Sequence, residues 1–306
     1  MPRLPRFKRS PDIPPLRLTS RDGEILKCLQ RHRFLRSYHI VALSAGSRQQ
    51  VLRRLQRLFH HGYLERPCCQ INYYQSGSRR IAYGIGNKGA RWLKRELVLP
   101  YHKLDRKWKN RVTRLFLEHA LLVSDVMVAV ELACRNQPGV RLLTPDDLDL
   151  PKKREPFQWT VDIGRRLKCG VIPDRVFGLD FNGKPCWYFL EADRGTMPIT
   201  RSNLDQTSFQ RKLLAYEATW SQNLHRTRFG WQRFRVLTVT TNSQRVQGII
   251  EACRGLAHGH GLFLFLDAAA LAKHADILTI PWQTCRPEKT EVLDEGFVYA
   301  KTGIET

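Results

Sequence analysis

The sequence predicts an α/β protein, α+β overall, in which a small helical domain closed by a β-hairpin precedes a mixed sheet flanked by helices. Capped helical periodicity fills the first hundred residues, and extended apolar stretches alternate with helical ones after that. The charge also changes sharply between the two parts. A chain of 306 residues is long enough to form two hydrophobic cores.

The charge is concentrated at the N-terminal end. Residues 1–114 contain 27 lysines and arginines and 6 acidic residues, a net charge of +21, whereas residues 115–306 carry a net charge of only +2. A field confined to one domain indicates a polyanionic partner, and nucleic acid fits best. A membrane surface or an acidic protein is the alternative, but no amphipathic basic helix with an exposed apolar face is evident.

Two compartment signals agree with each other. There is no apolar run that could span a bilayer and no signal segment at the start, so we expect a cytoplasmic protein without membrane association. The eight cysteines include no C-x-x-C pair, and several lie in apolar runs. We therefore expect neither a disulfide framework nor a structural zinc site.

The N-terminal elements follow in a regular order. Residues 1–17 hold five prolines and five basic residues, which predicts a flexible basic arm. Three helices come next, each introduced by a capping hydroxyl: from Thr19 or Ser20 to about Gln30, from Ser37 through Leu43, and from Ser47 to Gly62.

The third helix has two distinct faces. Apolar residues recur at helical spacing between Val51 and Phe59. The opposite face carries the side chains that reach base edges and phosphates from a major groove: Arg48, Gln49, Gln50, Arg53, Arg54 and Arg57. A solvated basic face is the alternative interpretation.

A hairpin closes this domain. Residues 63–65 and 81–83 form plausible paired strands, and the tip carries Arg79 and Arg80. A helix then runs from about residue 87 to residue 97. The order of elements over residues 18–98 resembles the winged helix superfamily, which implies base reading by the third helix and phosphate or minor-groove contacts by the wing arginines.

The remaining chain divides into a basic linker at 99–111, an α/β domain at 112–285 and a tail at 286–306 whose role we do not assign. In the α/β domain we expect helices at 112–135, 204–222 and 243–256, and extended stretches at 140–143, 157–163, 171–180, 186–192, 234–241 and 262–266, with a short apolar piece near 277–281.

Three carboxylates stand out in the α/β domain. Asp174 precedes one strand, and Glu191 and Asp193 end the next strand, two residues apart and therefore on one face. If the strands form a hairpin turning at Asn182-Gly183, the three side chains converge. Clustered carboxylates favour a divalent cation, with Mg²⁺ or Mn²⁺ as the expected cofactor. Surface carboxylates at a strand end are the alternative.

Pro173-Asp174 followed by Glu191-x-Asp193 resembles the PD-(D/E)xK nucleases, so the resemblance implies a restriction-endonuclease-like sheet. Asp193 stands where that superfamily has lysine, and Lys212 on the next helix is the available replacement. This resemblance implies catalytic roles for Asp174, Glu191, Asp193 and Lys212, with Glu118 as a further carboxylate, and metal ligation by Asp174, Glu191 and Asp193.

The combined pattern is more specific than the carboxylates alone. A winged helix, Glu118-His119, Pro-Asp, the stretch from Phe189 to Thr196 and a Lys-x-x-x-Tyr helix together resemble the replication-relaxation family, which includes type C plasmid mobilisation relaxases. The resemblance implies metal-dependent nicking of double-stranded DNA at a specific transfer or replication origin, with a homodimer or accessory mobilisation proteins as further partners.

Two questions stay open at the level of sequence. The nucleophile is a metal-activated water or, alternatively, the hydroxyl of Tyr216, which lies one turn after Lys212. The alternative function is a non-catalytic transcription or replication regulator with an inactive nuclease-like domain, because the lysine expected at position 193 is missing.

Overall fold

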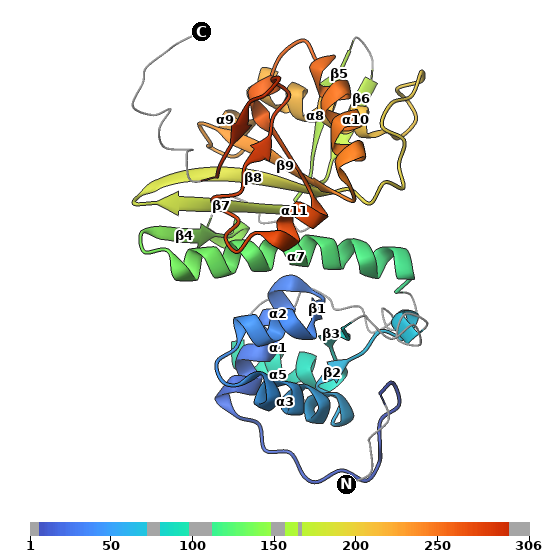
Figure 1. Cartoon of the computed structure of the whole chain (residues 1–306), viewed down its shortest axis with the longest axis vertical. Helices are drawn as coiled ribbons and strands as arrows, with labels where there is room; N and C mark the ends of the chain where they lie inside the picture. The colour runs from blue at the N-terminus through green and yellow to red at the C-terminus, as the bar shows by residue number, and fades with distance from the viewer. Residues whose placement is uncertain (1–5, 72–79, 98–111, 148–156, 165–166, 294–306) are drawn as a thin grey trace. The chain divides into compact units, whose positions relative to one another are not determined.

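The computed structural model describes residues 6–71, 80–97, 112–147, 157–164 and 167–293 (Figure 1). The expected fold class is confirmed, since helices accompany a large mixed sheet. None of the helices in the described part of the chain is long and apolar enough to cross a membrane. Residues 72–79, which include most of the hairpin tip, and the linker at 99–111 lie outside the described residues.

The chain forms two compact units, Met1–Val128 and Ala129–Thr306. The first unit has a three-stranded sheet in the order β1-β3-β2. Its elements are α1 (Ser20–His32), β1 (Leu35–Arg36), α2 (Ser37–Leu43), α3 (Arg48–His60), β2 (Leu64–Glu65), the 3-10 turn η1 (Cys68–Gln70), β3 (Ala82–Ile85), α5 (Asn87–Leu97) and the first part of α7 (Arg114–Asn136).

Local sequence signals produce these elements. Thr19 caps α1 in a reciprocal capping box with Asp22, and the Ser47 hydroxyl accepts from the Gln50 amide at the start of α3. Gly62 follows α3 with a φ of 82°, which suits glycine. The expected helix order and strand pairing, with β2 and β3 antiparallel, are therefore present.

Helix α7 begins the second domain in the sequence-based prediction, but its first part packs within the first unit. The Ser124 hydroxyl donates to the Phe34 carbonyl at 2.6 Å, and Arg36 donates to both oxygens of Asp125 at 2.8 and 2.9 Å. Leu121 joins a small apolar cluster with Phe34. The two compact units thus divide inside α7, whereas the sequence predicts a domain start at residue 112. Local sequence patterns do not reveal these contacts, because they join residues 89 and 90 positions apart.

The second unit is built on a seven-stranded mixed sheet in the order β12-β11-β10-β9-β8-β7-β4. Its elements after α7 are β4 (Val140–Leu143), η2 (Pro145–Asp147), β5 (Trp159–Ile163), β6 (Leu167–Val171), β7 (Arg175–Phe181), β8 (Lys184–Ala192), α8 (Phe209–Ser221), α9 (Leu224–Thr227), β9 (Phe234–Thr240), α10 (Ser243–Arg254), η3 (His260–Leu262), β10 (Phe263–Asp267), α11 (Ala268–Lys273), β11 (Trp282–Gln283) and β12 (Thr290–Glu291).

The sheet mixes both strand directions. β7 pairs antiparallel with β8, whereas β8, β9 and β10 run parallel, with α8 and α10 in the connections. β5 and β6 form a separate antiparallel pair. The sequence predicted one extended stretch over 171–180, but β6 ends at Val171 and β7 begins at Arg175. Pro173 lies between them and has no N–H for a ladder.

One apolar core fixes the helices against the sheet. α8 and α10 contribute to the same buried cluster as the strands, so they cover the same sheet face. Its members include Trp187 and Phe189 of β8, Val236 of β9, Phe209 and Leu213 of α8, and Val246 and Ile249 of α10. Side chains of β8 that point to this face and lie beyond the apolar core can therefore meet α8 and α10.

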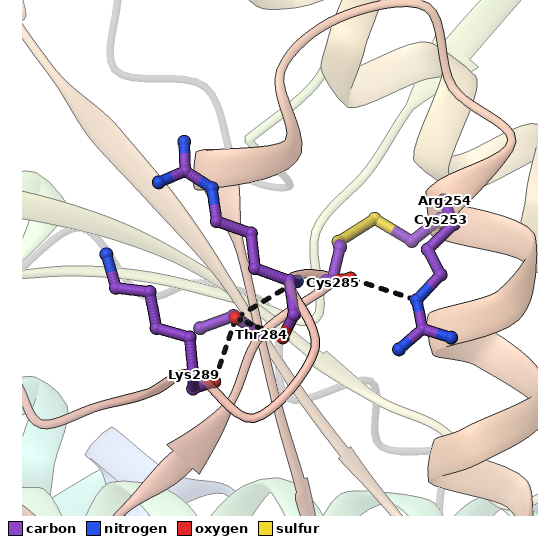
Figure 2. The surroundings of a disulfide bond; sticks show 6 residues. Cys253, Arg254, Thr284, Cys285 and Lys289 are labelled. Atoms are coloured by element: carbon purple, nitrogen blue, oxygen red, sulfur yellow. Dashed lines mark hydrogen bonds between the residues drawn. A yellow bond between two sulfur atoms is a disulfide. The ribbon is translucent and has the colours of Figure 1, made fainter.

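A disulfide joins Cys253, at the end of α10, to Cys285, just after β11 (Figure 2). The expectation of no disulfide is wrong for this pair, because tertiary structure brings together two buried cysteines 32 residues apart. The surrounding turn is hydrogen-bonded as well. Arg254 donates to the Cys285 carbonyl at 3.0 Å, and the Thr284 hydroxyl donates to the Lys289 carbonyl at 2.9 Å.

Candidate functional site

The β7–β8 hairpin brings Asp174 and Glu191 together. Asn182 and Gly183 have φ values of 52° and 86°, so the tight turn expected at these residues is confirmed. The register pairs Arg175 with Leu190, which places Asp174 opposite Glu191 and on the same face. The Asp174 carboxylate also accepts the Ala192 amide at 2.7 Å.

Two residues of α8 hold the Glu191 carboxylate. Lys212 donates to one oxygen and Tyr216 to the other, each at 2.5 Å. The Glu191 side chain is 3% exposed, whereas that of Lys212 is 36% exposed. Lys212, the predicted replacement for the lysine missing at position 193, thus lies on the Glu191 carboxylate, and its side chain is partly exposed.

The electrostatics of this cluster follow from burial and proximity. Burial raises the pKa of Glu191, and the nearby Asp174 raises it further against the opposing effect of Lys212. Burial alone would lower the pKa of Lys212, but the carboxylates of Glu191 and Asp174 raise it overall. Glu191 and Lys212 thus hold their protons more strongly than usual, and the charge of Asp174 acts on both of them.

Asp193 has different partners. Arg245 of α10 donates to both of its carboxylate oxygens, at 2.6 and 3.1 Å, and Thr240 donates to one of them at 2.7 Å. Burial would raise the pKa of Asp193, but the hydrogen bonds from Arg245 and Thr240 lower it overall. Both oxygens of Asp193 thus accept hydrogen bonds from Arg245 and Thr240, and its role as a metal ligand stays a prediction.

The fit of a divalent cation rests on Asp174 and Glu191. In the parts of the chain that the structure describes, no three histidine, cysteine or acidic side chains are grouped as a metal site. Two opposed carboxylates are nevertheless suitable hard oxygen ligands. Thr238 lies opposite Glu191 in the β8–β9 register, and its hydroxyl is buried with no hydrogen-bond partner among the described residues. The site therefore has an unused polar group beside its most buried carboxylate.

Glu118 belongs to the first unit, in α7, where it accepts a hydrogen bond from Arg114 at 3.1 Å. Its role as an additional carboxylate remains a prediction. Arg245 and Thr240, by contrast, were missed by sequence reasoning. No local signal identifies them, because they lie 52 and 47 residues from their partner Asp193.

The basic face of α3 divides into two parts. Four of the predicted DNA-contacting residues are exposed at the N-terminal end of the helix: Arg48, Gln49, Gln50 and Arg53. Arg54 instead pairs with Asp22, which is fully buried. Arg57 donates to the Pro15 carbonyl at 2.8 Å.

The described part of the N-terminal arm lies along α3 and β2. Arg9 donates to the Phe59 carbonyl at 3.0 Å and pairs with Glu65, and His61 contacts the Pro14 carbonyl at 3.0 Å. The part of the arm from residue 6 onward is thus held by hydrogen bonds. Of the two wing arginines, Arg80 stacks over Tyr38 at 5.0 Å, and Arg79 lies outside the described residues.

The replication-relaxation family model matches residues 26–231, about two thirds of the chain and the region that holds both α3 and the carboxylates. The chain belongs to the replication-relaxation family. Membership implies an interaction with DNA and a role in replication or in the mobilisation of mobile elements. Searches of curated proteins and of solved structures gave no significant match to this member of the replication-relaxation family.

Proposed function

We propose that this replication-relaxation protein is a divalent-metal-dependent endonuclease that nicks one strand of double-stranded DNA at a specific transfer or replication origin. The observation that supports this proposal most is the grouping of Asp174, Glu191 and Lys212. It lies at the open end of the β7–β8 hairpin, opposite the turn. Two carboxylates and an ammonium group on one sheet face are the residue types that metal-assisted phosphodiester cleavage requires.

Each residue has a distinct proposed task. Asp174 and Glu191 would hold Mg²⁺ or Mn²⁺, which when bound lowers the pKa of water and neutralises charge on a phosphate. Lys212 is the partly exposed cation of the group, so its ammonium is suited to contact a phosphate oxygen of the scissile strand. Its raised pKa keeps it charged at neutral pH.

Tyr216 is better suited to position Glu191 than to attack DNA. Its side chain is 1% exposed, and its hydroxyl donates to Glu191. Burial raises its pKa well above the ordinary value of 10.0, which disfavours the phenolate that a nucleophile requires. These features favour water as the nucleophile over a covalent tyrosine intermediate.

The first unit would select the DNA site. Arg48, Gln49, Gln50 and Arg53 offer donors that match base edges and phosphates, and Arg80 is a further exposed cation of the same unit. The local net charge of +21 supplies the non-specific attraction.

The direct test is nicking of supercoiled plasmid that carries the cognate origin, with Mg²⁺ or Mn²⁺ and with chelator as the control. Wild-type protein should nick only with metal, and Asp174→Ala and Glu191→Ala should bind the same DNA without nicking. A wild-type protein that binds its origin and never nicks it would contradict the endonuclease proposal.

The second candidate is a non-catalytic transcription or replication regulator. One observation favours it: both oxygens of Glu191 are already bound by Lys212 and Tyr216, and Asp193 is bound by Arg245. In that case origin binding would persist, and no variant at Asp174 or Glu191 would change any DNA-dependent activity.

A further inference from the structure

Asp193 and Arg245 form a closed ion pair between the end of β8 and the start of α10. Arg245 binds both oxygens of the carboxylate, and the two side chains are 6% and 15% exposed. A guanidinium that binds a carboxylate through two hydrogen bonds fixes both position and orientation. The pair is therefore a rigid connection, in contrast to the partly exposed Lys212.

The same arginine also fixes the segment that leaves β8. Arg245 donates to the Met197 carbonyl at 2.6 Å. Gly195, between Asp193 and Met197, adopts a left-handed φ of 72°, which lets the chain turn back toward Arg245. Ile199 then packs closely on α10, since a Cβ added at Gly248 would meet its side chain at 2.6 Å. Residues 197–199 are thus attached to α10.

These residues in turn attach to the start of α8. The amide of Phe209 donates to the Pro198 carbonyl at 3.0 Å, and the amide of Gln210 donates to the Ile199 carbonyl at 2.8 Å. Both amides belong to the first turn of α8, whose N–H groups have no partners within the helix itself. The first turn of α8 is therefore fixed to the segment that Arg245 holds.

Lys212 follows directly in the second turn of α8 and reaches Glu191 at 2.5 Å. A continuous set of contacts thus runs from Asp193 through Arg245, residues 197–199 and the first turn of α8 to Lys212. We propose that Asp193 and Arg245 are positioning residues that hold α8 so that Lys212 stays on the Glu191 carboxylate.

This inference rests on the proposed function for its catalytic consequence, and it gives a reason for the aspartate at position 193. The reactive lysine is carried by a separate helix, so its distance from Glu191 depends on where that helix begins. The ion pair at the strand end fixes the start of α8. Lys212 is thereby positioned relative to Glu191 as precisely as a lysine on β8 itself would be.

The test compares Arg245→Met and Asp193→Asn with a matched control, Arg235→Met, in the full-length protein. Arg235 pairs with Glu291 at 2.6 Å, also between partly buried side chains, and no contact of the set above includes it. Two quantities are measured: amide hydrogen exchange in residues 197–212 without DNA, and the nicking rate constant at saturating origin DNA together with the half-saturating DNA concentration.

For Arg245→Met and Asp193→Asn we expect exchange at the Phe209 and Gln210 amides to become at least about tenfold faster. The nicking rate constant should fall by about 10–100-fold at an unchanged half-saturating DNA concentration. Arg245→Lys should recover part of both losses, because it retains the charge without the double hydrogen bond. Arg235→Met should change neither quantity.

The inference is overturned if Arg245→Met and Asp193→Asn leave exchange in the first turn of α8 at the wild-type rate, or if Arg235→Met produces an equal change. If Arg245→Met does not fold, Arg245→Lys and Asp193→Asn decide the same question. A wild-type protein that does not nick contradicts the proposed function only, since the exchange measurements still decide whether the ion pair holds α8.

Discussion

Glu191 and Asp193 lie two residues apart at the end of β8, and their environments differ in almost every respect. Glu191 is held by a lysine and a tyrosine from α8, and burial raises its pKa. Asp193 is held by an arginine from α10 and a threonine from β9, and these hydrogen bonds lower its pKa. Two carboxylates at one strand end thus have pKa values shifted in opposite directions.

The two environments indicate which carboxylate is better suited to the proposed cation site. Burial disfavours both anions, but the hydrogen bonds from Arg245 and Thr240 outweigh this effect at Asp193, whereas Lys212 and Tyr216 do not outweigh it at Glu191. These environments favour the Glu191 side of the strand end for the proposed cation site and the Asp193 side for the proposed positioning role.

The largest expected effect is on stability. Arg245→Met should destabilise the protein by about 3–5 kcal/mol, because it leaves the buried Asp193 anion unpaired. Lys212→Met should cost about 1 kcal/mol or less, since Glu191 can take up a proton and Lys212 is partly exposed. Urea unfolding of both variants at neutral pH measures the difference. Equal losses would show that the two carboxylates are held alike.

The next effect separates activity from stability. Glu191→Gln should lower the nicking rate by more than about 100-fold, and its free energy of unfolding should stay within about 1 kcal/mol of wild type, because the variant removes a poorly solvated charge. Asp193→Asn should instead lose stability. Plasmid nicking and urea unfolding on the same preparations test this, and a strongly destabilised Glu191→Gln would contradict the comparison.

The same contrast is expected for two adjacent arginines of α3. Arg53→Ala should lower affinity for the origin by about 1–3 kcal/mol without loss of stability, because its side chain is exposed. Arg54→Ala should lower stability by a similar amount, because Asp22 is fully buried beneath it. DNA titration at fixed salt and thermal unfolding distinguish the two. Exchanged outcomes would assign DNA contact to Arg54.

The smallest expected effect is the pH dependence. The pKa of Asp193 is lowered below its ordinary value of 3.8, so its contribution to stability is present above that value and is lost as the pH falls below it. The pKa of Glu191 is raised, so its unfavourable contribution is absent in acid and grows as the pH rises from the ordinary value of 4.5 through the folded value. Unfolding free energies across acidic to neutral pH should therefore change in opposite directions in Asp193→Asn and Glu191→Gln, relative to wild type.

Features that depend on near neighbours along the chain could be predicted from the sequence. Caps at Thr19 and Ser47, the positive-φ turn at Asn182-Gly183 and the two-residue period of β8 depend on neighbours within a few positions, so they could be predicted. The same reasoning placed Asp174 beside Glu191. Lys212 was suggested instead by the family resemblance, and its catalytic role stays a prediction. Short-range geometry is nearly fixed by residue type, and this is why these predictions succeeded.

The partners of the charged side chains depend on the tertiary structure. It pairs Asp193 with Arg245 and the buried Asp22 with Arg54. It also joins Cys253 to Cys285, and the two compact units divide inside α7. Such pairings span tens of residues and depend on how helices pack on the sheet. Since a charged side chain has many possible partners and periodicity specifies only its face, no pattern in the sequence could select among them.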